Sequence, residues 1–543
     1  MKNKYLFPEI NFSISKRPLQ NVKRLFGTNI LLNLSVLLSL LSVGSFLYWY
    51  LNDLNLSYLD SRAHLNIARR VMDNLKPGAT QLGSVWLPLP HILMLPTIWI
   101  DFMWQSGLSG AIVSMISYVI TSIMIFSFLR KLKIGMLGSI IGVLIFALNL
   151  NVLFLQSTSM TELLLICVMT AGVYRLIDWF NSDNLIYLIQ SAFFIFLSTL
   201  IRYDGWFLFI MAVGLIGLRT LWKKGYKTAE GTVILFAVLA GFGILLWFLW
   251  NLAIYKDPLY FALGPYSARA QQIAIEASGL LITKGNILLS LQTYAYAVLY
   301  NSNLLVGFLG ILGMVVFWLD KKVSLNTKIA AIALLSPIVF NITSLFFGHS
   351  VIYVEGVSGG WFNVRYGLMM APAIAIFTGF LVDRLSRLRY LILGLLTFVM
   401  VFNVMNLDIV TLDDAVSGIS GLDVDVEEAS EALGNRVREE TGLILISTAK
   451  HDAILFTSSL NQKRFIHEGT GLYWENSLAR PEKWARWIVL RPNDMSDAVY
   501  KAMIKTDYKN KYNLVLDYKT ADVYELKPEY LSGLITNPIL KHK

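Results

Sequence analysis

Apolar runs of about 18 residues or more recur along the first 407 residues of this chain, and several of them contain no charged residue. A run of that length can cross the hydrocarbon core of a bilayer as a helix. The mean hydropathy of +0.57 over 543 residues is also unlike that of a soluble globular protein. The sequence therefore predicts a polytopic all-α membrane protein.

We expect about eleven transmembrane helices and one further apolar segment that does not cross the membrane. The doubtful segment, 87–104, is short for a span and contains three prolines together with His91 and Asp101. The eleven predicted spans are 30–51, 109–129, 135–153, 160–179, 185–200, 206–221, 230–254, 303–319, 328–347, 364–382 and 390–407.

The distribution of positive charge decides between the two topologies. If 87–104 lies along the membrane surface, 20 of the Lys and Arg residues before position 408 share one side with the basic N-terminus and 9 lie on the other. If that segment crosses, 11 of these Lys and Arg residues lie on the side of the N-terminus and 18 lie on the other side. Because cytoplasmic loops carry the excess of Lys and Arg, we expect residues 1–29 to be cytoplasmic. The loops 52–108 and 255–302 then face outward from the cell membrane.

The C-terminal region, 408–543, differs from the rest in charge and in pattern. It contains 21 acidic and 17 basic residues, whereas the preceding 407 residues contain 15 and 29. Strand-like runs at 442–447, 485–490 and 512–526 alternate with helix-prone segments, as in a small α/β domain. We expect this domain to be soluble and extracytoplasmic. The basic excess of the membrane part reflects orientation in the bilayer, and no nucleic acid is expected as a partner.

Three acidic residues at the outer ends of predicted spans are the candidate catalytic groups: Asp60, Glu162 and Asp204. An ionisable side chain at membrane depth costs roughly 2.5 kcal/mol or more, so it suggests function. Asp60 and His64 are spaced to share one face of a helix. Each residue also has a plain structural interpretation, which for Asp60 with His64 is an incidental salt bridge on an interfacial helix. Glu162 suits a helix N-terminus, and Asp204 can simply neutralise the nearby Arg202.

Arg365 opens a predicted span and has no acidic neighbour nearer in sequence than Glu355. Its guanidinium suits bidentate binding of a phosphate, although an arginine in this place can also extend toward lipid headgroups.

The order of these elements resembles that of the polytopic GT-C glycosyltransferases. The resemblance is to the branch that contains protein O-mannosyltransferases and the lipid A aminoarabinose transferase, and it covers roughly residues 30–400. In that branch the first loop carries an acidic start, a later Ala-Arg pair and then a proline-rich segment. The counterparts here are Asp60, Ala68 with Arg69, and 87–91. Two positions depart from the pattern, because Ser61 replaces the usual second acid and His91 stands where Tyr is common.

The resemblance implies inverting transfer of a sugar from a polyprenyl-phosphate donor at the outer face of the membrane. Asp60 would be the general base, with Glu162 and Asp204 as further catalytic groups. A divalent metal ion is a candidate cofactor without an assigned ligand set, and the acceptor is a protein, a lipid or a polysaccharide. The substrate-binding residues implied are His64, Arg69, His91, Arg202, Tyr203, Arg365 and Tyr366.

Two other functions stay open at this stage: a transporter or flippase of a lipid-linked or polar substrate, and an inactive membrane scaffold. Transporters tend to place polar residues near the bilayer midplane, between two related halves. In this chain the charges gather at one face and no halves repeat, which favours an enzyme.

Overall fold

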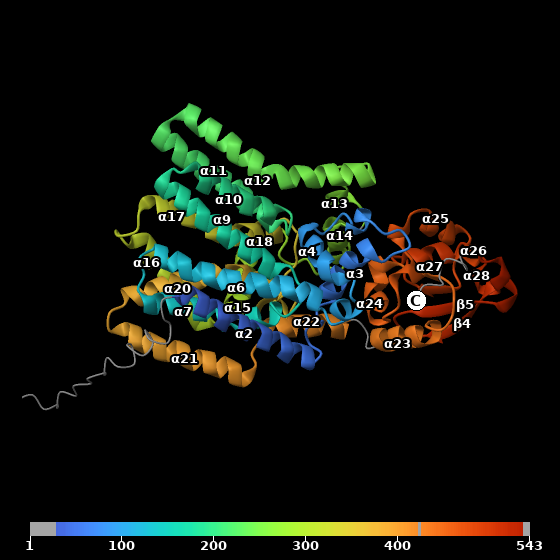
Figure 1. Cartoon of the computed structure of the whole chain (residues 1–543). Coiled ribbons are helices and arrows are strands. Elements are labelled where there is room, and N and C mark those ends of the chain that lie inside the picture. The colour runs from blue at the N-terminus through green and yellow to red at the C-terminus, as the bar shows by residue number, and fades with distance from the viewer. Residues whose placement is uncertain (1–28, 266, 422–424, 536–543) are drawn as a thin grey trace, which may run out of the picture.

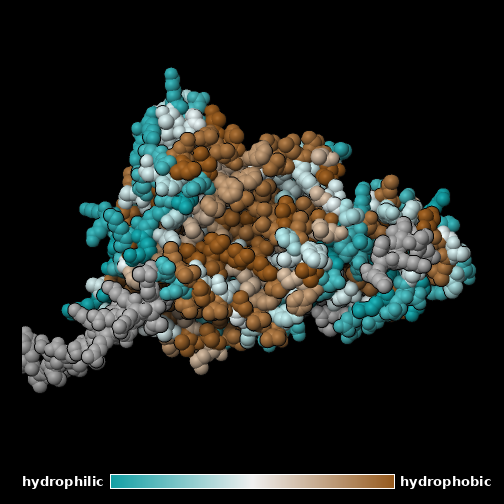
Figure 2. Space-filling model, in the orientation of Figure 1, coloured by the Kyte–Doolittle hydropathy of each residue, from teal (hydrophilic) through white to brown (hydrophobic). Residues whose placement is uncertain are grey.

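The protein consists of a long helical bundle with a smaller α/β domain at one end (Figure 1). The computed structural model describes residues 29–265, 267–421 and 425–535. On the face shown in Figure 2, a broad apolar belt covers the bundle between a hydrophilic edge and the hydrophilic C-terminal domain. This surface pattern is expected of helices that lie in lipid.

Every predicted span contains a helix. Because lipid offers no hydrogen bonds, an apolar segment there must pair its own backbone groups, and a helix does so. The helices of the bundle are α2 (Ile30–Leu51), α6 (Leu108–Lys131), α7 (Met136–Ala147), α9 (Glu162–Ser182), α10 (Leu185–Thr199), α11 (Asp204–Lys224), α12 (Tyr226–Tyr255), α16 (Leu304–Leu319), α17 (Leu325–Ala331) with η2 (Ile332–Leu335) and α18 (Ser336–Phe346), η3 (Val364–Met370) with α20 (Ala371–Arg384), and α21 (Leu388–Asn406).

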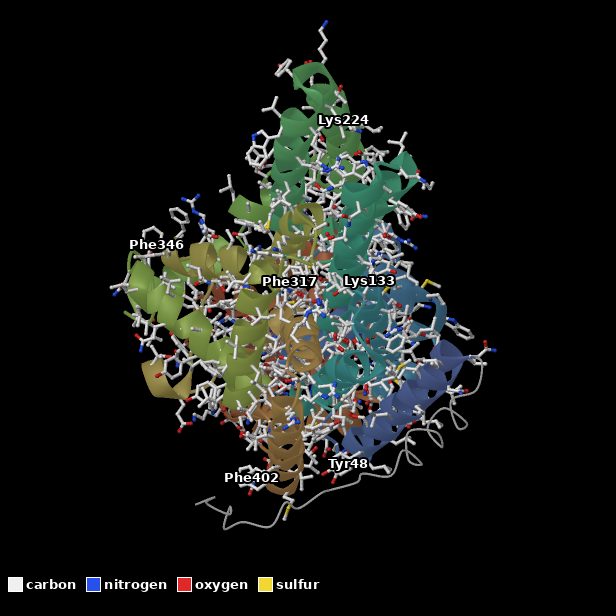
Figure 3. The ribbon with its side chains drawn as sticks, turned by 90° about the vertical axis from the view of Figure 1, so that its left-hand side faces the viewer. Tyr48, Lys133, Lys224, Phe317, Phe346 and Phe402 are labelled. Atoms are coloured by element: carbon white, nitrogen blue, oxygen red, sulfur yellow. The ribbon has the colours of Figure 1, made fainter. Side chains whose placement is uncertain are left out.

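The length and composition of these helices support a multi-pass membrane protein. Among the described residues, eight helices are long and apolar enough to cross a membrane, and a bent pair of helices adds a ninth. Two further helices of the predicted set, α7 and α10, are apolar but shorter. Figure 3 views the bundle from its hydrophilic end, with α21 and its Phe402 at one margin of the bundle.

Close packing between helices relies on small residues. A Cβ atom added to Gly138 of α7 would lie 2.7 Å from the carbonyl oxygen of Gly379 in α20. The backbones of the two helices are therefore in direct contact, as is common between membrane helices. Gly225 alone connects α11 to α12 with φ 80°, a conformation that suits glycine.

Two segments that the sequence places in outer loops are partly helical. Segment 87–104 contains α4 (Leu89–Ile98) and most of α5 (Asp101–Gln105), each too short to span a bilayer. Its position along the membrane surface stays a prediction. The predicted loop 255–302 contains α13 (Tyr260–Leu263), α14 (Ala268–Ala277) and the 16-residue helix α15 (Ile287–Ser302). The chain direction bends by 110° between α15 and α16.

Helix α22 (Val410–Gly421) packs against the bundle, although it lies beyond the predicted domain boundary at residue 408. Ile409, Val410 and Ala415 belong to the same apolar core as the membrane helices. The α/β fold therefore begins later than position 408, with α23 (Asp425–Val437).

The C-terminal domain is built on a five-stranded sheet of order β2-β1-β3-β5-β4. β1 is parallel to β2 and β3, whereas β5 is antiparallel to both β3 and β4. Alternate residues of β1 and β3 enter two separate cores on opposite faces of the sheet, as the period of a strand requires. The strands are β1 (Ile444–Leu445), β2 (Phe465–Ile466), β3 (Trp487–Leu490), β4 (Tyr512–Asp517) and β5 (Asp522–Leu526).

Short helices cover both faces of this sheet. They are α24 (Thr448–Thr457), α25 (Leu472–Ala479), α26 (Pro481–Trp484), α27 (Ala498–Met503) and α28 (Tyr508–Lys511). Helix α24 packs against α3 (Leu59–Met72), the first helix after α2, so the domain rests directly on the predicted loop 52–108 (Figure 1).

Single-cysteine labelling in intact cells checks the predicted orientation. In a Cys167→Ser background, cysteines at Lys223 and Lys321 should react with a membrane-impermeant maleimide only after the membrane is opened. Cysteines at Lys76 and Glu529 should react in intact, wall-stripped cells, because the charge split places their side outside. All four side chains belong to exposed residues, so the comparison is matched. The reverse labelling pattern would contradict the topology.

Candidate active site

The centre of the site is the guanidinium of Arg365, at the start of η3, which meets three carboxylates from distant segments. Its Nη2 donates to Oδ2 of Asp60 at 2.7 Å, and its Nε donates to Oε1 of Glu162 at 3.2 Å. Its Nη1 lies 3.6 Å from Oδ2 of Asp414 in α22. One buried cation therefore joins α3, α9 and α22.

A second guanidinium, that of Arg202, completes the cluster. Its Nη1 donates to the same Oε1 of Glu162 at 2.9 Å, and its Nε donates to Oδ2 of Asp204 at 3.3 Å. The Glu162 side chain is 0% exposed, and its other oxygen, Oε2, has no hydrogen-bond partner in the described part of the chain. Because buried polar atoms are normally paired, this oxygen is a ready acceptor for a ligand hydroxyl.

Local structure explains how these side chains reach one another. Glu162 and Asp204 each occupy the first turn of their helix, where the helix dipole favours a negative charge. Arg202 lies in the tight turn between α10 and α11. At Gly205 a Cβ atom would overlap with the carbonyl group of Ser198, so only glycine lets the two helices meet so closely.

Aromatic rings cover the two guanidinium groups. Cζ of Arg365 lies 4.7 Å from the ring centroid of Tyr58, and Cζ of Arg202 lies 4.9 Å from that of Tyr366. Both distances allow attraction between the cation and the ring. The Tyr58 hydroxyl donates to Oδ2 of Asp414 at 3.0 Å. Burial, aided by the Asp414 charge, raises the pKa of this hydroxyl well above its usual value, so Tyr58 stays a donor.

Exposure separates Asp60 from the other acids of the cluster. Its side chain is 42% exposed, whereas those of Glu162, Asp204 and Asp414 are buried. In the described part of the chain, Arg365 donates a hydrogen bond to Oδ2 of Asp60 and none to Oδ1. The Oδ1 atom is therefore available to another partner. Asp60 is therefore the carboxylate that an incoming molecule can reach.

His64 pairs with His91 instead of forming the predicted pair with Asp60. Nδ1 of His64 lies 2.9 Å from Nε2 of His91, and the ring of Trp86 packs beside it at 4.4 Å. Burial, together with the charges of Arg202 and Arg365, lowers the pKa of His64 to about 3. The imidazole is therefore neutral at physiological pH. Its contacts link α3 to α4.

Arg69 lies outside the cluster, although the resemblance suggested contact with substrate. Its guanidinium donates to Oδ2 of Asp73 at 3.1 Å and to Oδ1 of Asp101 at 2.6 Å. It also donates to the carbonyl oxygen of Ile98 at 2.9 Å. These bonds connect α3 with the end of α4 and the start of α5.

Tyr203 borders the cluster. Its hydroxyl donates to the carbonyl oxygen of Val85 at 2.8 Å, and its ring stacks on Phe261 of α13. The aromatic segment near 260 thus lies over the turn that carries Arg202. Tyr366, in contrast, lies between the two arginines and belongs to the cluster.

The C-terminal domain holds the helix that carries Asp60. Oδ2 of Asp452 in α24 accepts from Nδ2 of Asn66 at 2.9 Å, and its Oδ1 accepts from Nη1 of Arg70 at 3.1 Å. Nδ2 of Asn74 also lies 3.1 Å from Nε2 of His467. Helix α3 is therefore held along its length by groups from two parts of the chain.

Sequence reasoning missed Tyr58 and Asp414. Tyr58 lies two residues before Asp60 but resembles any aromatic residue at a membrane interface. Asp414 was assigned to the soluble domain because it follows the last predicted span. Apolar residues in fact continue past Asp408, because Ile409, Val410 and Leu412 precede Asp414 and Ala415 and Val416 follow it. That continuity was the available signal.

The donor arrangement does not fit a resident metal ion. Within the described residues, no group of three or more His, Cys, Asp or Glu side chains is placed to hold one. The cluster acids are paired with arginines instead. Use of a divalent metal ion stays a prediction of the sequence resemblance, and the reaction steps below require none.

No protein-family model matches the chain, and no curated protein sequence does. Solved structures are similar in fold. ArnT from Cupriavidus metallidurans bound to undecaprenyl phosphate aligns with a TM-score of 0.55 at 12% identity, over 90% of this chain and 98% of that one. Its apo structure aligns with a TM-score of 0.50 at 12% identity, with the same coverage. The apo oligosaccharyltransferase of Archaeoglobus fulgidus aligns with a TM-score of 0.47 at 11% identity, over 93% of this chain and 75% of that one. The predicted GT-C-like membrane fold is confirmed by the similarity to ArnT.

Replacing Asp414 by Asn should destabilise the protein. The variant removes a charged acceptor from Arg365 and Tyr58, and a buried group that loses its partner costs about 1–3 kcal/mol. The control is Asp413→Asn, because the neighbouring Asp413 is exposed; surface changes usually stay within about 0.5 kcal/mol. Unfolding of the purified variants in detergent measures the difference. Equal stability of the two variants would show that Asp414 is not part of the buried network.

Proposed function

We propose that this protein is a membrane glycosyltransferase that moves a sugar from a polyprenyl-phosphate donor to an acceptor hydroxyl at the outer face of the membrane. The observation that carries the proposal is one accessible carboxylate, Asp60, bound to the buried guanidinium of Arg365, which Glu162 links to the more accessible guanidinium of Arg202. The fold supports it too, because ArnT, which has this fold, was solved with undecaprenyl phosphate bound. The position of the cluster at helix ends favours an enzyme over a transporter.

Asp60 is the general base in this proposal. The free oxygen of its carboxylate accepts the proton of the acceptor hydroxyl while the hydroxyl oxygen attacks the anomeric carbon of the donor sugar. The bond between that carbon and the phosphate oxygen breaks, and its electron pair leaves with the phosphate. Attack from the side opposite the leaving group inverts the anomeric centre.

The two arginines offset the charge that develops on the departing lipid phosphate. Arg202 is the more accessible of the two, with a side chain 18% exposed against 6% for Arg365. Arg202 is therefore the first contact for the phosphate, and Arg365 orients Asp60. Glu162 and Asp204 fix the guanidinium planes in advance, so little reorganisation is needed during the reaction.

The donor carries its own activation as a sugar phosphate, which suits a site on the outer face, away from cytoplasmic nucleotides. The acceptor is a protein, a lipid or a polysaccharide. The C-terminal domain lies beside α3 and is a candidate surface for contact with the acceptor.

Asp60→Asn should lower turnover strongly while donor binding stays nearly intact. The amide keeps the shape of the carboxylate and loses its basicity, and loss of a positioned general base costs about 10²–10⁴ in rate. Asp53→Asn is the matched control, because Asp53 is exposed in the same loop and has φ 56°, which Asn tolerates. The assay supplies the purified protein with a panel of polyprenyl-phosphate sugars and follows release of the sugar to water, which serves as the acceptor hydroxyl. Loss of donor binding with unchanged turnover of bound donor would assign the base elsewhere.

Arg202→Lys should weaken donor use, with an increase of about tenfold in the KM for the donor. An ammonium group cannot reproduce the planar fork that a phosphate meets in arginine. Arg269→Lys, in the exposed part of α14, is the control. A fall in protein yield without a change in KM would instead indicate a purely structural role for Arg202.

A further inference from the structure

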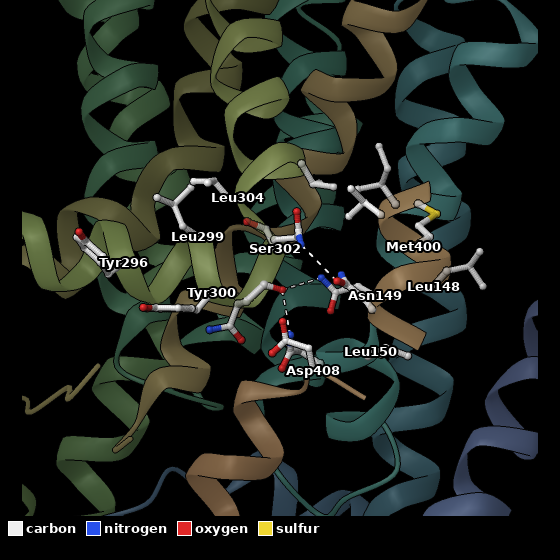
Figure 4. A pocket seen from close by; sticks show the side chains of 17 residues that line it. Leu148, Asn149, Leu150, Tyr296, Leu299, Tyr300, Ser302, Leu304, Met400 and Asp408 are labelled. Atoms are coloured by element: carbon white, nitrogen blue, oxygen red, sulfur yellow. Dashed lines mark hydrogen bonds between the residues drawn. The ribbon is translucent and has the colours of Figure 1, made fainter. Parts of the chain in front are cut away.

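A pocket of about 340 Å³ lies where α15 bends into α16, apart from the charged cluster (Figure 4). We call it the amide pocket, because five asparagines line it. They are Asn149, Asn151, Asn301, Asn303 and Asn403. Asn149 and Asn151 flank the start of α8 (Leu150–Leu155), and Asn403 comes from α21.

The lining suits an uncharged ligand rich in hydroxyl groups. Amide side chains both donate and accept hydrogen bonds, and Tyr296 and Tyr300 add hydroxyls and ring faces. None of the described residues that line the pocket is Lys, Arg or His, and Asp408 adds a negative charge. A phosphate would find no cation here, so this chemistry differs from that of the charged cluster.

One buried amide has an unused acceptor. Asn301 is 1% exposed, and its Nδ2 donates to the carbonyl oxygens of Ala297 and Val364 at 2.8 and 2.7 Å. Its Oδ1 has no hydrogen-bond partner in the described part of the chain. Exchanging the two amide atoms would break both of the donated bonds, so this orientation is defined by the network. A ligand hydroxyl can complete it.

The other side of the pocket is apolar and adjoins the lipid-facing helix α21. Val399 and Met400 of α21 line it, together with Leu148 and Leu304. Neighbouring residues of α21, such as Phe402, are exposed, and Figure 3 places Phe402 at the margin of the bundle. A molecule with an apolar tail can therefore reach the pocket from the bilayer beside α21.

We propose that the amide pocket is a second binding site, specific for the uncharged, hydroxyl-bearing head group of an amphiphile, such as a sugar on an alkyl or lipid tail. The proposal goes beyond the transfer reaction and does not depend on it. Hydrogen bonds connect the pocket to segments next to the charged cluster. Asn301 donates to the carbonyl oxygen of Val364, the residue before Arg365, and Oδ1 of Asn151 accepts from the backbone and side chain of Thr411.

Photo-crosslinking of the full-length protein in lipid nanodiscs tests the proposal. The probe is dodecyl β-glucoside with a diazirine on its tail, and labelled peptides are mapped by mass spectrometry. Labelling should concentrate on 296–304 and 399–408. Unlabelled dodecyl β-glucoside should compete, whereas dodecanol and dodecyl phosphate should not.

Two matched pairs of variants on α21 sharpen the test. Val399→Trp fills the pocket and should reduce labelling about tenfold, whereas Val401→Trp, on the exposed face, should not. Asn403→Leu should reduce labelling without filling the pocket, and the exposed Asn406→Leu is its control. If either pocket variant fails to fold, the other pair decides the question.

Three results would overturn the proposal. Labelling spread over all lipid-facing helices and equal in Val399→Trp and Val401→Trp would mean that no pocket is occupied. Competition by dodecanol would mean that the tail alone is recognised. Competition by dodecyl phosphate would mean that the pocket does not prefer an uncharged head group to a charged one. Each outcome concerns binding only, so it is independent of whether sugar transfer is observed.

Discussion

The double ion pair of Glu162 with Arg202 and Arg365 is the interaction on which the arrangement of the site depends. A carboxylate that is fully buried is costly unless its charge is compensated and its oxygens are hydrogen-bonded. Here the two guanidiniums come from the turn between α10 and α11 and from the start of η3. The cost of burying Glu162 therefore disfavours any arrangement of these helices that separates the three groups. Arg365 extends the same constraint to α3 and α22 through Asp60 and Asp414.

The position of Asp60 is defined by contacts of helix α3 with two other parts of the chain. Helix α3 is joined to α4 and α5 by the bonds of Arg69 and by the contact between His64 and His91. On its other side, Asp452 of the C-terminal domain binds Asn66 and Arg70. A carboxylate that is half-exposed on a helix held this firmly keeps its direction without help from substrate. Such preorganisation is what a general base needs, because small displacements of a reacting group cost large factors in rate.

Local patterns in the sequence predicted a helix in every proposed span and three of the four acids that meet in the cluster. Apolar runs located every bundle helix, and the scarcity of acids before residue 408 pointed to Asp60, Glu162 and Asp204. The side-chain partners of these residues could not be predicted from local patterns. His64 bonds to His91, 27 positions away, and Asp414 reaches Arg365 from beyond the last predicted span. Helix α15 falls in the predicted loop 255–302, so its helical structure is a difference from the prediction. The contacts of His64 and Asp414 are set by packing between segments that are distant in the sequence. The periodicity of apolar residues does not encode such packing.

The bend between α15 and α16 connects the two proposed sites physically. A helix that breaks inside a membrane protein frees backbone groups that lipid cannot satisfy. At this break the carbonyl oxygen of Asn301 accepts from Nδ2 of Asn149 at 2.7 Å and of Asn151 at 3.3 Å. The asparagines that satisfy the backbone are therefore the same ones that line the pocket. Because the side chain of Asn301 also binds the carbonyl group of Val364, the break that creates the pocket anchors the backbone from which Arg365 extends. The amide pocket thus follows from an irregularity of the bundle that also anchors the residue before Arg365.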